Sequence, residues 1–298
     1  MLCSVFLLPL SALVIIFYSQ ILKFFFFKIS KKTEIFKSID FLYGIFLLTF
    51  LSFFLNLFFP LKYFSTFIFT FGIIGFVFLI LKKKLIFEFN IVYLLILIFI
   101  FLIISNNNEL IYDSKLYHYQ IIKYNFENKI IFGLSNLDPR LGFLSSWQQF
   151  LSIFGFNIYL VSNLSIILYA FFFNIIFLKN FFILKTSRVF FSLIVLFLLA
   201  YAFIHPKLNG TIFMSLGSPE VDTICILFLV LSIFTFLDSN RNFYLVIISV
   251  ILCATSKLSY VGSGFIILYL LFINPRLIKN FRFSFLITIY GLSFLLKS

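Results

Sequence analysis

The stretch at residues 91–124, IVYLLILIFIFLIISNNNELIYDSKLYHYQIIKY, decides the fold. Its first half is an unbroken apolar run, and its second half turns abruptly polar. In lipid a helix satisfies all of its own backbone polar groups, so an apolar run of this kind is typical of a membrane-crossing helix. The polar half begins a polar segment that continues to Gln149. We therefore expect a helical chain embedded in a membrane, with one large and chemically mixed loop.

The composition of the whole chain favours lipid as its solvent. Of the 298 residues, 63% are hydrophobic and 11% are charged, whereas a soluble domain carries roughly 25% charged residues. The net charge is +13, but the positive residues form short runs between apolar segments, so we expect no nucleic-acid partner. Cys3, Cys225 and Cys253 lie in apolar stretches without metal-like spacing, which predicts packing roles.

Ten apolar stretches are candidate membrane spans. They predict an all-α, polytopic transmembrane helix bundle and a single integral membrane domain over 1–298, with extra N-terminal spans in 1–88 and the core in 89–298. The first span lacks a basic flank and a clear cleavage site, so we expect it to be retained. The candidate spans are 3–22, 39–60, 65–81, 89–105, 152–178, 189–205, 221–237, 242–257, 259–274 and 283–297.

The Lys and Arg residues are distributed unequally between the two sides of this arrangement. Fifteen of the 23 fall in alternate loops, beginning with 23–38 and 82–88. By the positive-inside rule that side is cytoplasmic, here of a bacterial inner membrane. The N-terminus and the two polar loops then lie outside, together with six of the ten acidic residues and both histidines.

The first polar loop begins with IYDSKLYHYQIIKY. On a helix, Asp113, Tyr117, Gln120 and Tyr124 share one face. This spacing predicts a short amphipathic helix on the outer membrane surface, with a carboxylate near its start. A carboxylate there offsets the helix dipole, so Asp113 is either a helix cap or a reactive group.

The same loop continues with GLSNLDPRLGFLSSWQQF. The planar fork of Arg140 suits both phosphate and carboxylate, so it either clamps a phosphate or pairs with an acid of its own loop. Ser145 or Ser146 is expected to cap a helix that begins at Trp147. Trp147 is expected to be an anchor at the membrane interface.

The second polar loop ends in GSPEVD, with Glu220 and Asp222 at the start of the seventh span. Acids at a membrane boundary are costly and tend to be functional, although acids at a helix start also offset the dipole. His205 and Lys207 form a basic pair able to meet a phosphate. Lys257, near the outer end of the eighth span, either extends to the interface or faces an acid or a lipid phosphate.

These residues, in this order, resemble the GT-C membrane glycosyltransferases, which include the lipid-A arabinose transferases and the protein O-mannosyltransferases. Asp113 matches the first-loop catalytic acid of that class, and Glu220 and Asp222 match its second acidic motif. More narrowly, YDSKLYHYQIIKY and GLSNLDPRLGFLSSW are similar to the signature loop YDxxLYH…GLxNxxxRLGFxSSW of a bacterial membrane-protein family among the GT-C-like enzymes. Two features depart from the class: three further spans precede the span that leads to the first acid, and the core is expected to be truncated at its C-terminal end.

The resemblance implies inverting transfer of a sugar from a polyprenyl-phosphate donor to a glycan, lipid or protein acceptor, with Asp113 as general base. Glu220 and Asp222 would orient the acceptor or, with Asp113, hold Mg²⁺ or Mn²⁺. The residues implied to stabilise the leaving phosphate are Lys257, Arg140, Lys207 and His205. Those implied to lie beside the donor or acceptor are Tyr112, Tyr117 and His118.

A transporter or a flippase for lipid-linked sugars is the alternative, in which the same acids would be ion sites. The chain shows no pair of inverted repeats, and its charges gather in an outer loop rather than at mid-membrane, which favours the enzyme. A glycan polymerase or ligase would use the same kind of donor, and an inactive scaffold subunit also fits. The discriminating observation is whether the two acidic motifs converge, with Lys257 or Arg140 beside them.

Overall fold

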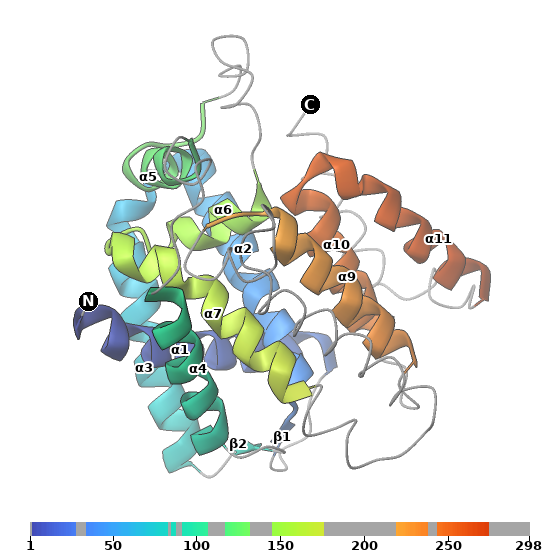
Figure 1. Ribbon diagram of the computed structural model, residues 1–298, viewed down its shortest axis with the longest axis horizontal. Coiled ribbons are helices and arrows are strands. Elements are labelled where there is room, and N and C mark those ends of the chain that lie inside the picture. The colour runs from blue at the N-terminus through green and yellow to red at the C-terminus, as the bar shows by residue number, and fades with distance from the viewer. Residues whose placement is uncertain are drawn as a thin grey trace.

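The computed structural model of the chain is built almost entirely from helices (Figure 1), which confirms the all-α class. It describes residues 2–27, 34–82, 85–87, 91–106, 117–131, 145–175, 219–237 and 243–273. The α-helices within them are α1 (Leu2–Phe27), α2 (Phe41–Phe58), α3 (Ser65–Leu81), α4 (Ile91–Asn106), α5 (Tyr119–Glu127), α6 (Ser146–Ser152), α7 (Ile158–Asn174), α9 (Asp222–Leu237), α10 (Phe243–Ser256) and α11 (Gly264–Ile273).

Short elements connect these helices. Strands β1 (Glu34–Phe36) and β2 (Leu85–Phe87) form a two-stranded parallel sheet in which Glu34 is paired with Leu85. Three 3₁₀ turns lie at helix junctions: η1 (Ser38–Asp40), η2 (Leu61–Tyr63) and η7 (Leu258–Ser263).

Eight of the ten predicted spans coincide with helices, namely α1 to α4, α7 and α9 to α11. The predicted spans at 189–205 and 283–297 lie outside the described residues. The prediction at 152–178 starts too early, because α6 ends at Ser152 and a turn separates it from α7. Asn157 caps α7 by accepting a hydrogen bond from the backbone N–H of Leu160 at 3.1 Å.

Two helical stretches of the described residues, Phe6–Phe25 and Ser38–Phe58, are long and apolar enough to cross a membrane by length and composition. Their most apolar windows are 61% and 56% buried inside the molecule. The other apolar helices have 10–17 residues, and a 17-residue helix is about 26 Å long against a hydrocarbon core of about 30 Å. A bundle of about ten spans stays a prediction.

Antiparallel packing sorts the connecting segments to two ends of the molecule. At one end β1 pairs with β2, and Lys23 Nζ lies 2.9 Å from Asp40 Oδ2. At the other end Asn56, near the end of α2, binds the backbone of Asn125 in α5, and α6 packs against both α5 and α10. We call these the lysine-rich end (Lys23, Lys37, Asp40, β1 and β2) and the polar-loop end (η2, α5, α6, 219–222 and 255–257).

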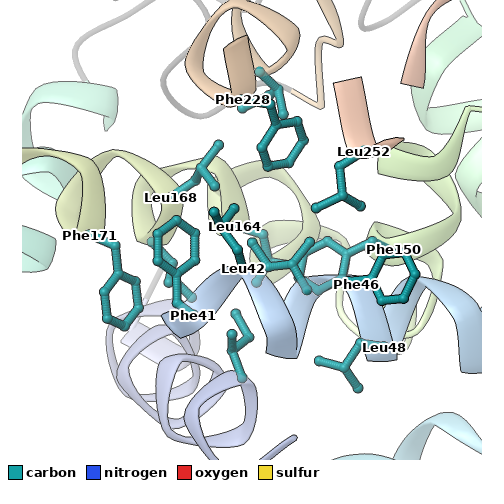
Figure 2. Close-up of a cluster of buried hydrophobic side chains, with 14 of the residues drawn as sticks. Phe41, Leu42, Phe46, Leu48, Phe150, Leu164, Leu168, Phe171, Phe228 and Leu252 are labelled. Atoms are coloured by element: carbon teal, nitrogen blue, oxygen red, sulfur yellow. The ribbon is translucent and has the colours of Figure 1, made fainter. Parts of the chain in front are cut away.

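Part of the hydrophobic core lies between α2, α6, α7, α9 and α10, as Figure 2 shows. Phe41 of α2 stacks on Phe171 of α7, with ring centroids 4.7 Å apart and an interplanar angle of 11°. Phe228 of α9 and Leu252 of α10 reach the same cluster. This apolar packing fixes the ends of α9 and α10 relative to α6, and so it determines which loop residues meet.

Candidate functional site

The polar-loop end brings together segments that lie far apart in the sequence. In Figure 1, α6 lies between α5 on one side and α10 on the other. The residue before α5 is His118, the residue after α10 is Lys257, and α9 begins at Asp222. Three stretches that the sequence marks as unusual therefore share one end of the helical body.

Asp222 and Lys257 form an ion pair at this end. Lys257 Nζ donates to Asp222 Oδ1, and the two side chains are 45% and 44% exposed. The pair exists because α9 and α10 pack antiparallel, which sets the first residue of α9 beside the residue that follows α10. Asp222 of the second polar loop therefore lies beside Lys257. This is one of the two contacts that the predicted convergence of the loops requires.

Hydroxyl groups link this ion pair to α6. Ser145 caps α6, and its side chain accepts from the backbone N–H of Gln148 at 3.5 Å, which confirms the predicted cap. Ser146 Oγ lies 2.8 Å from Ser256 Oγ and accepts from Thr255 Oγ1 at 2.9 Å. Because Ser256 precedes Lys257, these hydroxyls tie the end of the first loop to the cation.

The other face of α6 holds the start of α5. His118 is 7% exposed, and its Nδ1 lies 2.5 Å from Gln148 Nε2. With the amide nitrogen as donor, Nδ1 accepts and the neutral imidazole carries its proton on Nε2. The Tyr117 ring lies 4.2 Å from the His118 ring, centroid to centroid. Burial raises the pKa of the Tyr119 phenol, and the Ser162 side chain only partly offsets this, so Tyr119 stays protonated at neutral pH.

Helix α5 is the predicted amphipathic helix. Ile121, Ile122 and Asn125 are buried, while Gln120 and Lys123 are exposed. The helix begins at Tyr119, and its N-cap position is occupied by His118. Residues 117–118 extend this helix toward its N-terminus as a π-helical turn, and His118 has helical dihedral angles without a side-chain cap bond. Asp113 lies outside the described residues, so both its alternatives, a helix cap and a reactive group, stay predictions.

A buried asparagine that the sequence analysis passed over joins α2 to both loop helices. Asn56 is fully buried, and its Nδ2 donates to the carbonyl oxygens of Asn125 at 2.9 Å and Asn128 at 2.8 Å. Its Oδ1 accepts from Gln149 Nε2 at 3.0 Å. One turn earlier, the Ser52 hydroxyl donates to the Gln149 carbonyl at 2.6 Å. Polar residues inside an apolar helix were the signal that could have identified this contact.

Five of the ten predicted site residues lie in the described part of the chain, and all five are at the polar-loop end. Glu220, two residues before α9, is half-buried. The other four are Tyr117, His118, Asp222 and Lys257. The predicted residues that lie outside the described residues are Asp113, Tyr112, Arg140, Lys207 and His205.

Trp147 is not an anchor at an interface, and that expectation is wrong. Its side chain is 2% exposed and stacks on Phe150, with ring centroids 5.2 Å apart. Helix α6 is enclosed by α2, α5 and α10, which turns the indole toward the core. Three side-chain atoms of this helix, Trp147 Nε1, Gln148 Oε1 and Gln149 Oε1, are buried and have no hydrogen-bond partner among the described residues.

The Mg²⁺ or Mn²⁺ ion that the sequence allowed stays a prediction, because Asp113, one of its three proposed acids, lies outside the described residues. No three His, Cys, Asp or Glu side chains among them are placed to hold a metal. The Asp222 carboxylate already faces the Lys257 ammonium, whose charge would repel a divalent cation. We therefore assign no chemical step to a metal at Asp222.

Two cysteines lie about one helical turn from the Asp222–Lys257 ion pair, toward the interior of α9 and α10. The Cys225 thiol donates to the Cys253 carbonyl oxygen at 3.5 Å, and the Cys253 thiol donates to the Cys225 carbonyl oxygen at 3.4 Å. Both side chains are buried. The packing role predicted for these two cysteines is confirmed, and the reciprocal contact helps to hold α9 against α10.

Comparison with known proteins identifies a family but no activity. A family model described as "Domain of unknown function (DUF8201)" matches residues 1–298. No curated protein and no solved structure matches the chain. The residues of the polar-loop end therefore carry the information about function.

Proposed function

We propose that the chain, which belongs to the DUF8201 family, is a membrane glycosyltransferase of GT-C-like architecture. It would move a sugar from a polyprenyl-phosphate donor to a cell-surface glycan, lipid or protein acceptor. The observation that carries the proposal is the convergence of both polar loops on one end of an otherwise apolar helical body. There α6 contacts His118 on one side and, through Ser256, the Asp222–Lys257 pair on the other.

Exposed apolar side chains support a membrane setting. Phe67 and Ile74 on α3 are 66% and 67% exposed, and Phe272 on α11 is 87% exposed. Side chains of this kind on two helices are suited to lipid and unsuited to water. In this proposal about ten spans cross a bacterial inner membrane. The N-terminus and the polar-loop end face outward, and the lysine-rich end faces the cytoplasm.

The chemistry begins with a base beside the acceptor hydroxyl. We assign this role to Asp113, which the sequence places four residues before Tyr117. By chain length alone its Cα is within about 15 Å of the Tyr117 Cα, since consecutive Cα atoms are about 3.8 Å apart. The carboxylate would take the hydroxyl proton while the oxygen attacks the anomeric carbon from the face opposite the leaving phosphate. The product would have inverted stereochemistry.

Departure of the polyprenyl phosphate leaves negative charge that a fixed cation stabilises. Lys257 is the candidate for this role at the polar-loop end, because its ammonium is half exposed and lies at the end of α10. Glu220 and Asp222 would orient the acceptor. We assign further phosphate contacts to Arg140, Lys207 and His205, and sugar contacts to Tyr112, Tyr117 and His118.

The test measures transfer by the reconstituted full-length chain. Vesicles would contain radiolabelled polyprenyl-phosphate sugars and native membrane glycans, and wild type would be compared with Asp113→Asn. This substitution keeps the size of the side chain and removes the base, so we expect transfer to fall by about 100-fold or more. Glu127→Gln is the matched control, because Glu127 is an exposed acid on α5 whose ion-pair partner among the described residues is Lys123.

The outcomes separate the candidate functions. Loss of transfer in Asp113→Asn at an unchanged protein level, with transfer retained in Glu127→Gln, supports the glycosyltransferase. Equal transfer by wild type and Asp113→Asn would remove Asp113 from the chemistry. Movement of the labelled lipid across the bilayer without transfer would favour the flippase instead.

A further inference from the structure

We propose that Asp222 is a built-in competitor for phosphate at Lys257, so that the Lys257 ammonium exchanges the carboxylate for the phosphate of a lipid-linked substrate. The inference rests on the proposed function for the identity of that substrate. It gives Asp222 a role at the donor phosphate in addition to the acceptor orientation proposed above. In the resting protein the carboxylate holds the ammonium, and substrate binding releases the carboxylate.

The exposure of the pair makes the exchange feasible. Both side chains are nearly half open to the surroundings, and ion pairs this exposed contribute little stability and break readily. The Lys23–Asp40 pair at the lysine-rich end is different. Its side chains are 15% and 6% exposed, and Asp40 also accepts from the backbone N–H of Lys37 at 2.9 Å. Of these two pairs, only Asp222–Lys257 can change partners without leaving a buried charge.

The released carboxylate keeps a favourable environment. Asp222 is the first residue of α9, where the partial positive charge of the helix start stabilises an anion. At 44% exposure it can also be hydrated. The exchange therefore costs little at Asp222.

The Lys257 ammonium can bind a phosphate as well as a carboxylate, because it offers three donors and a phosphate offers several acceptor oxygens. The buried hydroxyls of Thr255 and Ser256 bond with Ser146 of α6 and hold the end of α10 that carries Lys257. Removing the competing charge of Asp222 should therefore tighten phosphate binding, whereas removal of a residue that binds the substrate would weaken it.

The experiment titrates the full-length chain in a maltoside detergent, whose headgroup contains no phosphate. One arm uses inorganic phosphate and the other a short-chain polyprenyl phosphate, both followed by calorimetry. We expect Asp222→Asn to bind about two- to five-fold more tightly, the gain that loss of an exposed ion-pair partner predicts. We expect Lys257→Ala to bind at least about ten-fold more weakly, and Asp222→Asn/Lys257→Ala to match Lys257→Ala.

Two further measurements keep the result interpretable. Thermal unfolding of each variant confirms that it is folded before its affinity is used. Glu127→Gln removes a carboxylate from the exposed Lys123–Glu127 pair, whose N···O distance is 3.9 Å, and so tests net charge alone. A gain with both ligands shows that the phosphate group itself is recognised, and a gain with polyprenyl phosphate alone shows that the lipid is also needed. Either result supports the exchange.

Unchanged or weaker binding by Asp222→Asn would overturn the inference, as would an equal gain in Glu127→Gln. The outcome is independent of the transfer assay. If Asp113→Asn abolishes transfer but Asp222→Asn binds no more tightly, the glycosyltransferase stands and the exchange fails. If Asp222→Asn binds more tightly but no variant transfers sugar, the phosphate site stands and the glycosyltransferase fails.

Discussion

At the level of single residues, buried polar side chains hold the polar-loop end in shape. Asn56 alone satisfies two backbone carbonyl groups beyond α2 and the amide of Gln149. An amide has two donors and an acceptor, so one residue can connect three segments at once. Asn56 carries no reactive group. It therefore helps to build the site and is not among the residues proposed to take part in the chemistry.

Asn56→Ala should lower the free energy of unfolding by about 3 kcal/mol, because it strands buried hydrogen-bonding groups of Asn125 and Gln149. Denaturant titration in detergent measures the change. Thr70→Ala is the control, since Thr70 is exposed and bonds only to carbonyls of its own helix. A loss no greater than that of Thr70→Ala would mean that Asn56 does not hold the loop helices.

The Lys23–Asp40 pair anchors α1 to the start of α2. Asp40→Asn should destabilise the protein by about 3 kcal/mol, since it leaves a largely buried ammonium without its counter-charge. The comparison is Glu127→Gln, which removes one partner of an exposed pair and should cost less than about 1 kcal/mol. Similar effects of the two substitutions on thermal unfolding would show that Lys23 finds other compensation.

At the level of elements, the crossing of α1 and α2 depends on one close approach. A Cβ atom added at Gly44 of α2 would lie 2.1 Å from the backbone carbonyl oxygen of Ile15 in α1. A backbone atom cannot move aside as a flexible side chain can. The residue at this position therefore sets the separation of the two helices that are long enough to cross a membrane.

Gly44→Ala should destabilise the protein by about 2–3 kcal/mol, because the added methyl group forces α1 away from α2. Gly262→Ala is the matched control, since nothing lies within 4 Å of a Cβ at that position. Thermal unfolding of the two variants makes the comparison. Equal stability would show that the helices separate at no cost.

At the level of the whole molecule, the two ends differ in the elements and the ion pairs that they contain. β1, β2 and the Lys23–Asp40 pair lie at one end, and the loop helices with the Asp222–Lys257 pair lie at the other. The charge distribution in the sequence predicted the same division of loops, and the described loops follow it. The proposed function requires that the polar-loop end face outward, which is a separate prediction.

Labelling of introduced cysteines would check this orientation in cells. Lys62→Cys and Lys129→Cys, at exposed positions of the polar-loop end, should react with a membrane-impermeant maleimide in intact cells, because the reagent reaches only the outer face. Lys82→Cys, exposed beside β2, should react only after permeabilisation. Native cysteines would first be replaced by Ala. The reverse pattern would place the polar-loop end in the cytoplasm, where the proposed donor chemistry has no support.

Helix positions followed from the sequence more readily than contacts did. The predicted span at 65–81 has the bounds of α3, and α4 and α9 begin and end within two residues of their predictions. In lipid an apolar run has no water to satisfy its backbone polar groups, so it satisfies them within its own helix. The prediction missed the separation of α6 from α7, because the apolar pattern around Phe154 is the same whether these residues form a turn or a helix.

Only part of the candidate site was predictable from the sequence. Glu220, Asp222, Lys257 and His118 stand out as ionisable groups at the edges of apolar runs, and local pattern was enough to select them. Their partners were not predictable, because Gln148 and Ser146 have ordinary local surroundings. The burial of Trp147 likewise depends on three helices that enclose α6.

The sequence by itself determined the all-α class, the eight helices that match its apolar runs and the division of the described loops between two ends. These depend on composition and spacing, which act over a few turns of chain. Only the tertiary structure decided that Lys257 pairs with Asp222, that His118 meets Gln148 and that Asn56 binds the end of α5. Each of these contacts joins residues far apart in the chain, and their meeting depends on how whole helices pack.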